Sequence, residues 1–289
     1  MFNFFADIFG YVLNWIYILV KNYGFAIIIF SVLVKIAMLP LSIKQQKTLK
    51  KNEKMQKEIQ ILQIKHKGNQ EKLSQEMMDL YKREGINPFS GCFSLIIQMI
   101  LIISMFILVK SPMTYMTKID ENIINKQIET IKTEKGENSI SVQYPEMSIV
   151  KYLKEKNLTN NEMYINMDFL GLDLSKVPQE NFNDVTVYII PVLYVLSSFV
   201  SIKITSNVNN KKLEDKNDNK IENKEDLKEM DQAEVTAQMN KTMSWMMPIL
   251  SVSISLVAPL GLALYWLVNN IIMIIERLVL NKIFSREEN

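Results

Sequence analysis

The chain is poor in the residues that build covalent and metal-dependent sites. Its 289 residues include one cysteine, Cys92, and one histidine, His66. A single chain therefore cannot form a disulfide framework, a zinc site or a Cys/His catalytic pair. Glycine is also scarce, with 8 residues, and no glycine-rich phosphate loop of the GxxxxGK[ST] type occurs. These absences exclude the corresponding covalent, zinc-dependent and phosphate-binding sites within one chain.

Long apolar runs alternate with stretches rich in lysine, glutamate and asparagine. This segregation predicts an all-α, polytopic membrane bundle of five transmembrane helices. The predicted spans are residues 25–43, 93–110 and 185–205, followed by a hairpin of two short spans within 243–275. The connecting segments are residues 44–92, 111–184 and 206–242, and residues 276–289 form a tail.

Residues 1–24 carry apolar side chains at helical spacing before the first span. These are Phe2, Phe5, Phe9, Leu13, Ile16 and Val20. The pattern predicts a helix that lies in the membrane interface on the extracytoplasmic side. A sixth span is the alternative, and Asp7 and Asn14 argue against it. The segment has neither a basic start nor a small-residue cleavage site, so we do not expect a cleaved signal peptide.

The distribution of charge predicts the orientation. Basic residues dominate 44–92, whereas acidic residues outnumber basic ones in 111–184. The positive-inside rule then places 44–92 in the cytoplasm, the N-terminus outside and the C-terminus inside a cell (plasma) membrane. Helix formers fill 42–87 apart from a break at 67–69, which predicts a basic helical hairpin within 44–92. Residues 206–242 predict a charged cytoplasmic loop that is either largely flexible or a solvated helix. The apolar residues scattered through 111–184 would allow a small folded cap.

Lys35 interrupts the apolar run from Phe25 to Leu41. An isolated ammonium at that depth costs about 3 kcal/mol on insertion scales. The other predicted spans contain no acidic residue, so the sequence offers no ion-pair partner within the bilayer. We therefore expect a wet, positively charged cavity around Lys35. The alternative is a lysine that snorkels to the headgroups just beyond Pro40.

Two further sets of residues are candidates for the same cavity. Polar residues of the other spans are predicted to line it: Ser94, Gln98, Ser104, Ser197, Ser198, Asn269 and Asn270. Aromatic residues are predicted to form an apolar sliding surface: Tyr188, Tyr194, Trp245, Tyr265 and Trp266. For any single polar residue, an ordinary interhelical hydrogen bond is the better explanation of its presence. Anchoring in the aromatic belt is the alternative for Tyr188 and Trp245.

Three sequence blocks resemble the YidC/Oxa/Alb family of membrane protein insertases. The first comprises NYGFAII at 22–28, Lys35, LPL at 39–41 and KMQ at 54–56. The second comprises EMMDLYK at 76–82, Asn87-Pro88 and GCFSLIIQM at 91–99. The third is PLGLALYWLVNN at 259–270, which is similar to the last hairpin of the family.

The resemblance implies a five-span bundle with a hydrophilic groove that opens to the cytoplasm and to lipid. A positive residue of the first span, here Lys35, would attract the acidic or polar tail of a client protein. The client's transmembrane segment would then slide past the third and fifth spans into lipid, and the cytoplasmic hairpin would help to recruit clients. The chain departs from the family pattern at Lys35, where arginine is usual, and at Ser94 and Ile100, where prolines are usual.

The sequence therefore predicts a membrane protein insertase and foldase that is not an enzyme and uses no metal and no cofactor. Its expected partners are nascent membrane proteins and the lipid bilayer, with the Sec translocon, targeting machinery and the ribosome as candidates. The basic hairpin has no interleaved aromatic residues, so its sequence does not predict nucleic-acid recognition. The alternative function is a secondary transporter that uses Lys35 as an anion or ion site, although no internal repeat supports it. An intramembrane hydrolase lacks its Ser/His or paired-Asp residues within the spans.

Overall fold

The computed structural model describes residues 1–66, 68–85, 90–214 and 253–286. Outside the segment between α4 and α8, the labelled helices are α1 (Phe2–Val20), α2 (Tyr23–Lys65), α3 (Gln70–Arg83), α4 (Ser90–Lys110), α8 (Ile189–Glu214) and α10 (Leu260–Arg286). The segment between α4 and α8 holds α5 (Pro112–Tyr115), α6 (Glu121–Lys135), η1 (Glu137–Ser139), α7 (Pro145–Glu155), η2 (Pro178–Glu180) and η3 (Val185–Tyr188). It also holds a two-stranded antiparallel hairpin, β1 (Asp168–Phe169) and β2 (Leu172–Asp173).

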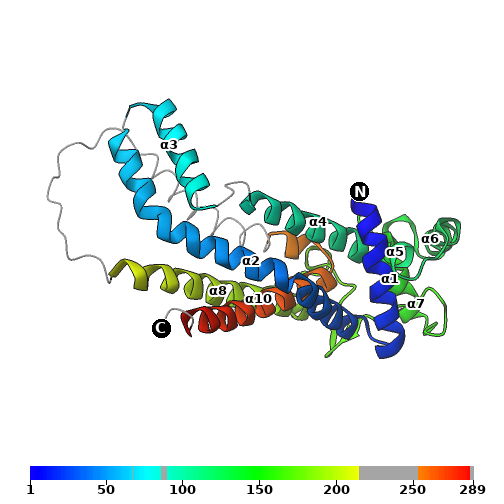
Figure 1. Ribbon diagram of the computed structural model, residues 1–289. Helices are drawn as coiled ribbons and strands as arrows, with labels where there is room; N and C mark the ends of the chain where they lie inside the picture. The colour runs from blue at the N-terminus through cyan, green and yellow to red at the C-terminus, as the bar shows by residue number, and fades with distance from the viewer. Residues whose placement is uncertain (67, 86–89, 215–252, 287–289) are drawn as a thin grey trace.

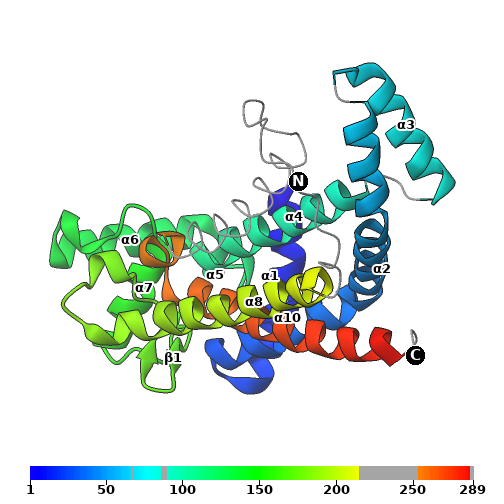
Figure 2. The same ribbon diagram turned by 90° about the vertical axis from the view of Figure 1, so that its left-hand side faces the viewer.

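The two ends of the helix bundle differ in structure. Helices α4, α8 and α10 run lengthwise, with α5, α6 and α7 gathered at one end and α3 with the last part of α2 at the other (Figures 1 and 2). Helix α10 packs against α2, α8 and α4, whereas α1 packs against α2 and α4. In both views α1 lies across the direction of α4, α8 and α10. We call residues 111–188 the cap.

Among the residues that the structure describes, four helices are long and apolar enough to cross a membrane. The candidate segments are Phe2–Val20, Tyr23–Lys47, Val185–Ile204 and Leu260–Leu280, and Ile96–Lys110 is a shorter apolar helix. The chain is therefore a mostly helical, multi-pass membrane protein. The last candidate extends past the predicted end of the fifth span at residue 275, since α10 continues without interruption to Arg286. Most of the predicted fourth span, 243–257, lies outside the described residues.

The turn between α1 and α2 is set by two residues with opposite roles. Lys21 adopts a left-handed conformation that ends α1, and its N–H donates to the carbonyl of Tyr17. Asn22 is extended, and its side-chain oxygen accepts from the N–H of Phe25 at 3.1 Å. An asparagine at this position satisfies one of the orphan donors of the new helix. The two helices thus turn sharply at the end that meets the cap.

The cap is a folded unit with its own apolar core. The buried side chains come from α5, α6, α7 and the segment around the β-hairpin: Met113, Met116, Ile124, Ile131, Met147, Ile149, Val150, Leu153, Ile165, Met167, Leu174 and Val177. They are continuous with the buried side chains of α1, α2, α4 and α10. The cap and the long helices therefore share one core.

Hydrogen bonds join the cap to the helix ends. The carbonyl of Asn166 accepts from the N–H of Tyr23 at 2.9 Å, and the Asn22 side chain donates to the carbonyl of Asp168 at 2.6 Å. At α10, the N–H groups of Leu260 and Gly261 donate to the carbonyls of Lys176 and Leu174 at 2.9 and 3.0 Å. The first backbone donors of a helix have no partner within it. The cap supplies those partners for both α2 and α10.

A buried carboxylate ties α7 to α5 inside the cap. Glu146 is 4% exposed and accepts from the N–H and hydroxyl groups of Thr114 at 3.4 and 2.6 Å and from the N–H of Met113 at 2.6 Å. Burial, which disfavours the charged form, raises the pKa of Glu146, although these three hydrogen bonds oppose the rise.

At the opposite end, α3 folds back along the last turns of α2. Met55 and Leu80 are buried against each other, with Ile59, Leu62 and Tyr81 around them. Arg83 pairs with Glu58 across the two helices, and Lys65 and His66 contact Glu76. Between the helices lies a shallow, open groove of about 330 Å³ that is lined by Glu58, Ile61, Leu62, Glu76, Asp79, Leu80 and Arg83. Apolar residues on both sides of the break at 67–69, Met55 and Leu80 among them, therefore pack together.

Replacing Gly10 by alanine should destabilise the protein. A Cβ at this position would lie 2.0 Å from the carbonyl oxygen of Tyr115, so α1 and α5 would have to separate. We expect a loss of about 1–3 kcal/mol, the usual range for overpacking, although alanine is the better helix former. Thermal unfolding in detergent measures this loss. Asn3→Ala on the exposed side of α1 is the control, and equal stability of the two variants would contradict the close approach.

Glu146 should make the stability of the cap fall as pH rises. Because its pKa is raised above the ordinary 4.5, the folded cap holds this proton where the unfolded chain has released it. The resulting stabilisation is complete below pH 4.5 and is lost as pH rises through the folded pKa. The unfolding temperatures of wild type and of Glu146→Gln are measured over a range of pH, and the difference between the two proteins is followed as pH rises. A difference that does not change with pH would show that Glu146 titrates normally.

Candidate functional site

Lys35 lies on the inner face of α2, at a point where the side chains of this face become less buried along the helix. Ile27 and Ser31 precede it by two turns and one turn on the same face, and both are fully buried. The Lys35 side chain is 23% exposed. The hydroxyl of Ser31 donates to the carbonyl of Ile27 in its own helix at 2.8 Å. The inner face of α2 thus changes from apolar to polar with distance from the cap.

Lys35 has an acidic partner that the sequence-based argument excluded. Its ammonium nitrogen lies 3.4 Å from Oε2 of Glu276 on α10, whose side chain is 11% exposed. Lys35 is 12 residues into α2 and Glu276 is 16 residues into α10, roughly 18 Å and 24 Å from the cap ends of these helices. Both depths are smaller than a hydrocarbon core of ~30 Å. The expectation of a lysine without an ion-pair partner was therefore wrong, because α10 runs past the predicted end of its span.

The inner face of α8 shows the same change of polarity. Ile190 and Tyr194 are buried near the cap, and Ser198 and Ser201 follow on the same face and are also buried. The opposite face carries exposed Val192, Leu193, Leu196, Phe199 and Val200. That apolar outer face suits contact with lipid.

A hydrogen-bonded cluster joins α8 to α10. The side-chain amide of Asn270 donates to the hydroxyls of Ser197 at 2.8 Å and Ser198 at 3.2 Å. Ser197 in turn donates to the carbonyl of Tyr194 at 2.8 Å. Three of the predicted groove residues therefore come together in one contact. It lies on a different side of α10 from Glu276, since six residues correspond to a rotation of about 240°.

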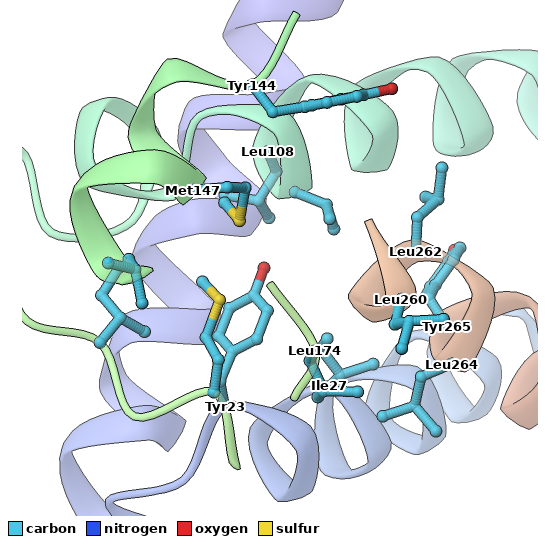
Figure 3. Close-up of a cluster of buried hydrophobic side chains, with 14 of the residues drawn as sticks. Tyr23, Ile27, Leu108, Tyr144, Met147, Leu174, Leu260, Leu262, Leu264 and Tyr265 are labelled. Atoms are coloured by element: carbon cyan, nitrogen blue, oxygen red, sulfur yellow. The ribbon is translucent and has the colours of Figure 1, made fainter. Parts of the chain in front are cut away.

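The end of the bundle next to the cap is closed by apolar packing. Figure 3 shows side chains of α2, α4, α7 and α10 converging there, among them Tyr23, Leu108, Met147 and Leu260. The Tyr23 hydroxyl points into this cluster and has no hydrogen-bond partner among the described residues. The interior is thus apolar next to the cap and contains charged and polar groups farther away.

The remaining predicted groove residues lie elsewhere. The amide of Asn269 donates to the carbonyl of Tyr265 in its own helix at 2.7 Å, two turns before Glu276 on the same face. The hydroxyl of Ser104 is buried between α4 and α1 and donates to the carbonyl of Phe2 at 3.2 Å. Gln98 is exposed on α4, and the side chain of Ser94 lies outside the described residues. The structure thus does not bring all seven polar residues together with Lys35.

The predicted aromatic surface is brought together in part. The rings of Tyr194 on α8 and Trp266 on α10 lie 6.3 Å apart at an interplanar angle of 42°. Tyr265 is buried in the closed end, and Tyr188 is partly buried in η3. Trp245 lies outside the described residues. Tyr194 and Trp266 are therefore the pair of this set that meets across α8 and α10.

Sequence reasoning missed Glu276, Ser31 and Ser201. The charged pair Glu276-Arg277 was read as the end of the span. A signal was nevertheless present, because Glu276 is seven residues after Asn269 and shares its helix face. Among the described residues, no three His, Cys, Asp or Glu side chains gather into a group that could hold a metal ion.

The fold and the site define a helical, multi-pass membrane protein with an ion pair between two of its spanning helices. The family model described as 60Kd inner membrane protein matches residues 15–287. The chain therefore belongs to this family, which is the YidC/Oxa/Alb family, and the resemblance seen in the sequence is confirmed.

Two relatives show how far the similarity extends. The chain is 25% identical over 272 residues to a membrane protein insertase YidC of Treponema denticola, covering 94% of this chain and 36% of that protein. It is 40% identical over 106 residues to one of Francisella tularensis subsp. novicida, covering 37% of this chain and 19% of that protein. The chain thus spans about a third of the length of the first relative and less of the second.

Removing the Asn270 amide should weaken the contact between α8 and α10. Asn270→Ala deletes two interhelical hydrogen bonds, and we expect a loss of about 0.6–1.7 kcal/mol, as for such bonds in other membrane proteins. Thermal unfolding in detergent, combined with Ser197→Ala in a double-mutant cycle, measures the coupling. Asn269→Ala is the matched control, since its amide bonds within α10. A coupling of zero between 270 and 197 would contradict the cluster.

Proposed function

We propose that this protein is a membrane protein insertase and foldase. It moves client transmembrane segments and short polar tails into the membrane through a hydrophilic groove that opens to the cytoplasm and to lipid. The observation that carries the proposal is the half-buried charge of Lys35 at membrane depth on the inner face of α2. The names of the two relatives and the family of the chain support the same activity.

The polarity of the interior supports a groove that is closed at one end. The apolar cluster next to the cap would stop water and ions, whereas Lys35, Asn269 and the Ser197–Ser198–Asn270 cluster would hydrate the other half. A polar tail that enters this half crosses part of the membrane without leaving polar surroundings. The free-energy barrier to translocation of the tail is lowered, because a shorter part of its path lies in apolar surroundings.

The client's apolar segment would leave sideways toward lipid. Tyr194 and Trp266 would form part of its path, with Tyr188, Trp245 and Tyr265 as further predicted members. Burial of the segment in lipid drives release, at roughly 25 cal/mol per Å² of apolar surface. The process requires no covalent chemistry and no cofactor.

The topology proposed from the charge distribution fits the fold. The cap lies outside the membrane, and the α2–α3 pair and the C-terminus lie in the cytoplasm. Helix α1 crosses the direction of α4, α8 and α10 and exposes Phe4, Ile8, Tyr11 and Trp15. Such a helix suits the plane of the interface, with its exposed apolar face toward lipid.

The activity is tested with purified protein in liposomes and a single-span client that has a short acidic translocated tail. Wild type and Lys35→Arg should insert the client, and Lys35→Ala should lower insertion by about ten-fold, the effect of roughly 1.4 kcal/mol. Protease protection of the tail is the readout. Lys151→Ala, which removes an exposed lysine of the cap, is the control.

Each other outcome has a definite meaning. Insertion by Lys35→Ala at the wild-type level would show that the charge of Lys35 is not needed for insertion. No insertion by folded wild-type protein would contradict the insertase. Ion or anion flux that depends on Lys35 in the same liposomes would favour the secondary transporter instead.

A further inference from the structure

The contact between Lys35 and Glu276 is loose. Its 3.4 Å separation exceeds the 2.7–2.9 Å that is usual for a charge-assisted N–H···O bond, and one carboxylate oxygen makes it. Lysine is a compact charge with three donors on a flexible stem. Among the described residues, Glu276 is its one hydrogen-bond acceptor. The ammonium thus retains the capacity to bond a second acceptor.

Loss of the carboxylate that pairs with Lys35 and its replacement by another carboxylate have different consequences. Separation leaves an unpaired charge in a half-buried place, which is strongly unfavourable. Exchange of the Glu276 carboxylate for another carboxylate keeps Lys35 paired throughout. The displaced Glu276 keeps a cationic neighbour, since it interacts electrostatically with Arg277 next to it.

We propose that Glu276 is a specificity-determining residue that occupies Lys35 until the carboxylate of a client tail displaces it. The inference rests on the proposed insertase function and deepens it. Glu276 resembles the client group chemically, so the two compete for one ammonium. When no client is bound, Glu276 compensates the charge of Lys35. An acidic tail that displaces Glu276 therefore gains only the difference in free energy between two similar ion pairs.

The competition has a measurable consequence for affinity. Without Glu276, an acidic tail meets an unpaired ammonium and binds more tightly, whereas a neutral tail gains nothing from the change. Glu276→Gln should therefore lower the client concentration for half-maximal insertion of an aspartate tail by about five-fold, the factor expected for a weak ion pair. The maximal rate should stay near that of wild type.

The experiment uses the full chain in liposomes and two clients that differ only in an aspartate or an asparagine in the translocated tail. Wild type, Glu276→Gln, Glu276→Asp and the control Glu162→Gln are compared. We expect the five-fold gain for Glu276→Gln with the aspartate client alone, a smaller gain for the shortened Glu276→Asp, and none for Glu162→Gln. Thermal unfolding checks that each variant is folded.

Three results would overturn the proposal. Equal loss of both clients in Glu276→Gln would show that the pair only joins α2 to α10. Wild-type behaviour with both clients would show that Glu276 does not compete, and an equal gain with both would rule out selection for charge. All three leave the insertase standing, whereas failure of wild type with either client would contradict the proposed function itself.

Discussion

Backbone donors at the start of a membrane helix need partners, and here the cap provides them. Leu174 and Lys176 accept from the first turn of α10, and Asn166 accepts from Tyr23 at the start of α2. These bonds hold both helices at one end, where Tyr23, Leu108 and Leu260 pack into an apolar cluster. Because that end is closed, the polar side chains of the same helices share the other half of the bundle.

The arrangement separates two requirements that conflict within a bilayer. A membrane protein must remain sealed, yet an insertase must offer polar surroundings to a tail in transit. The closed end meets the first requirement with apolar packing, and in the function that we propose the Ser197–Ser198–Asn270 cluster with Lys35 serves the second. Glu276 then explains how a lysine is kept at depth, since a paired charge is far less unfavourable there than a bare one.

Much of this organisation could be read from residue patterns. The runs around Phe25, Val185 and Leu260 predicted helices that the structure contains, and three sequence blocks predicted the family. The fold of the cap could not be read, since its apolar residues are scattered over short elements with no sustained period. The end of α10 was misplaced because hydropathy falls at Glu276, although the backbone remains helical to Arg286.

The sequence by itself determined the family, the mainly helical class and the presence of a charge, Lys35, within the apolar run from Phe25 to Leu41. These properties depend on local composition and on periodicity along one helix. Only the tertiary structure decided that Lys35 meets Glu276, which lies 241 positions away, and that Ser104 faces α1 while Asn270 faces α8. Such contacts depend on the rotation and register of one helix against another. The cap, which closes one end of the bundle, helps to fix this rotation and this register. A local sequence pattern does not predict either of them.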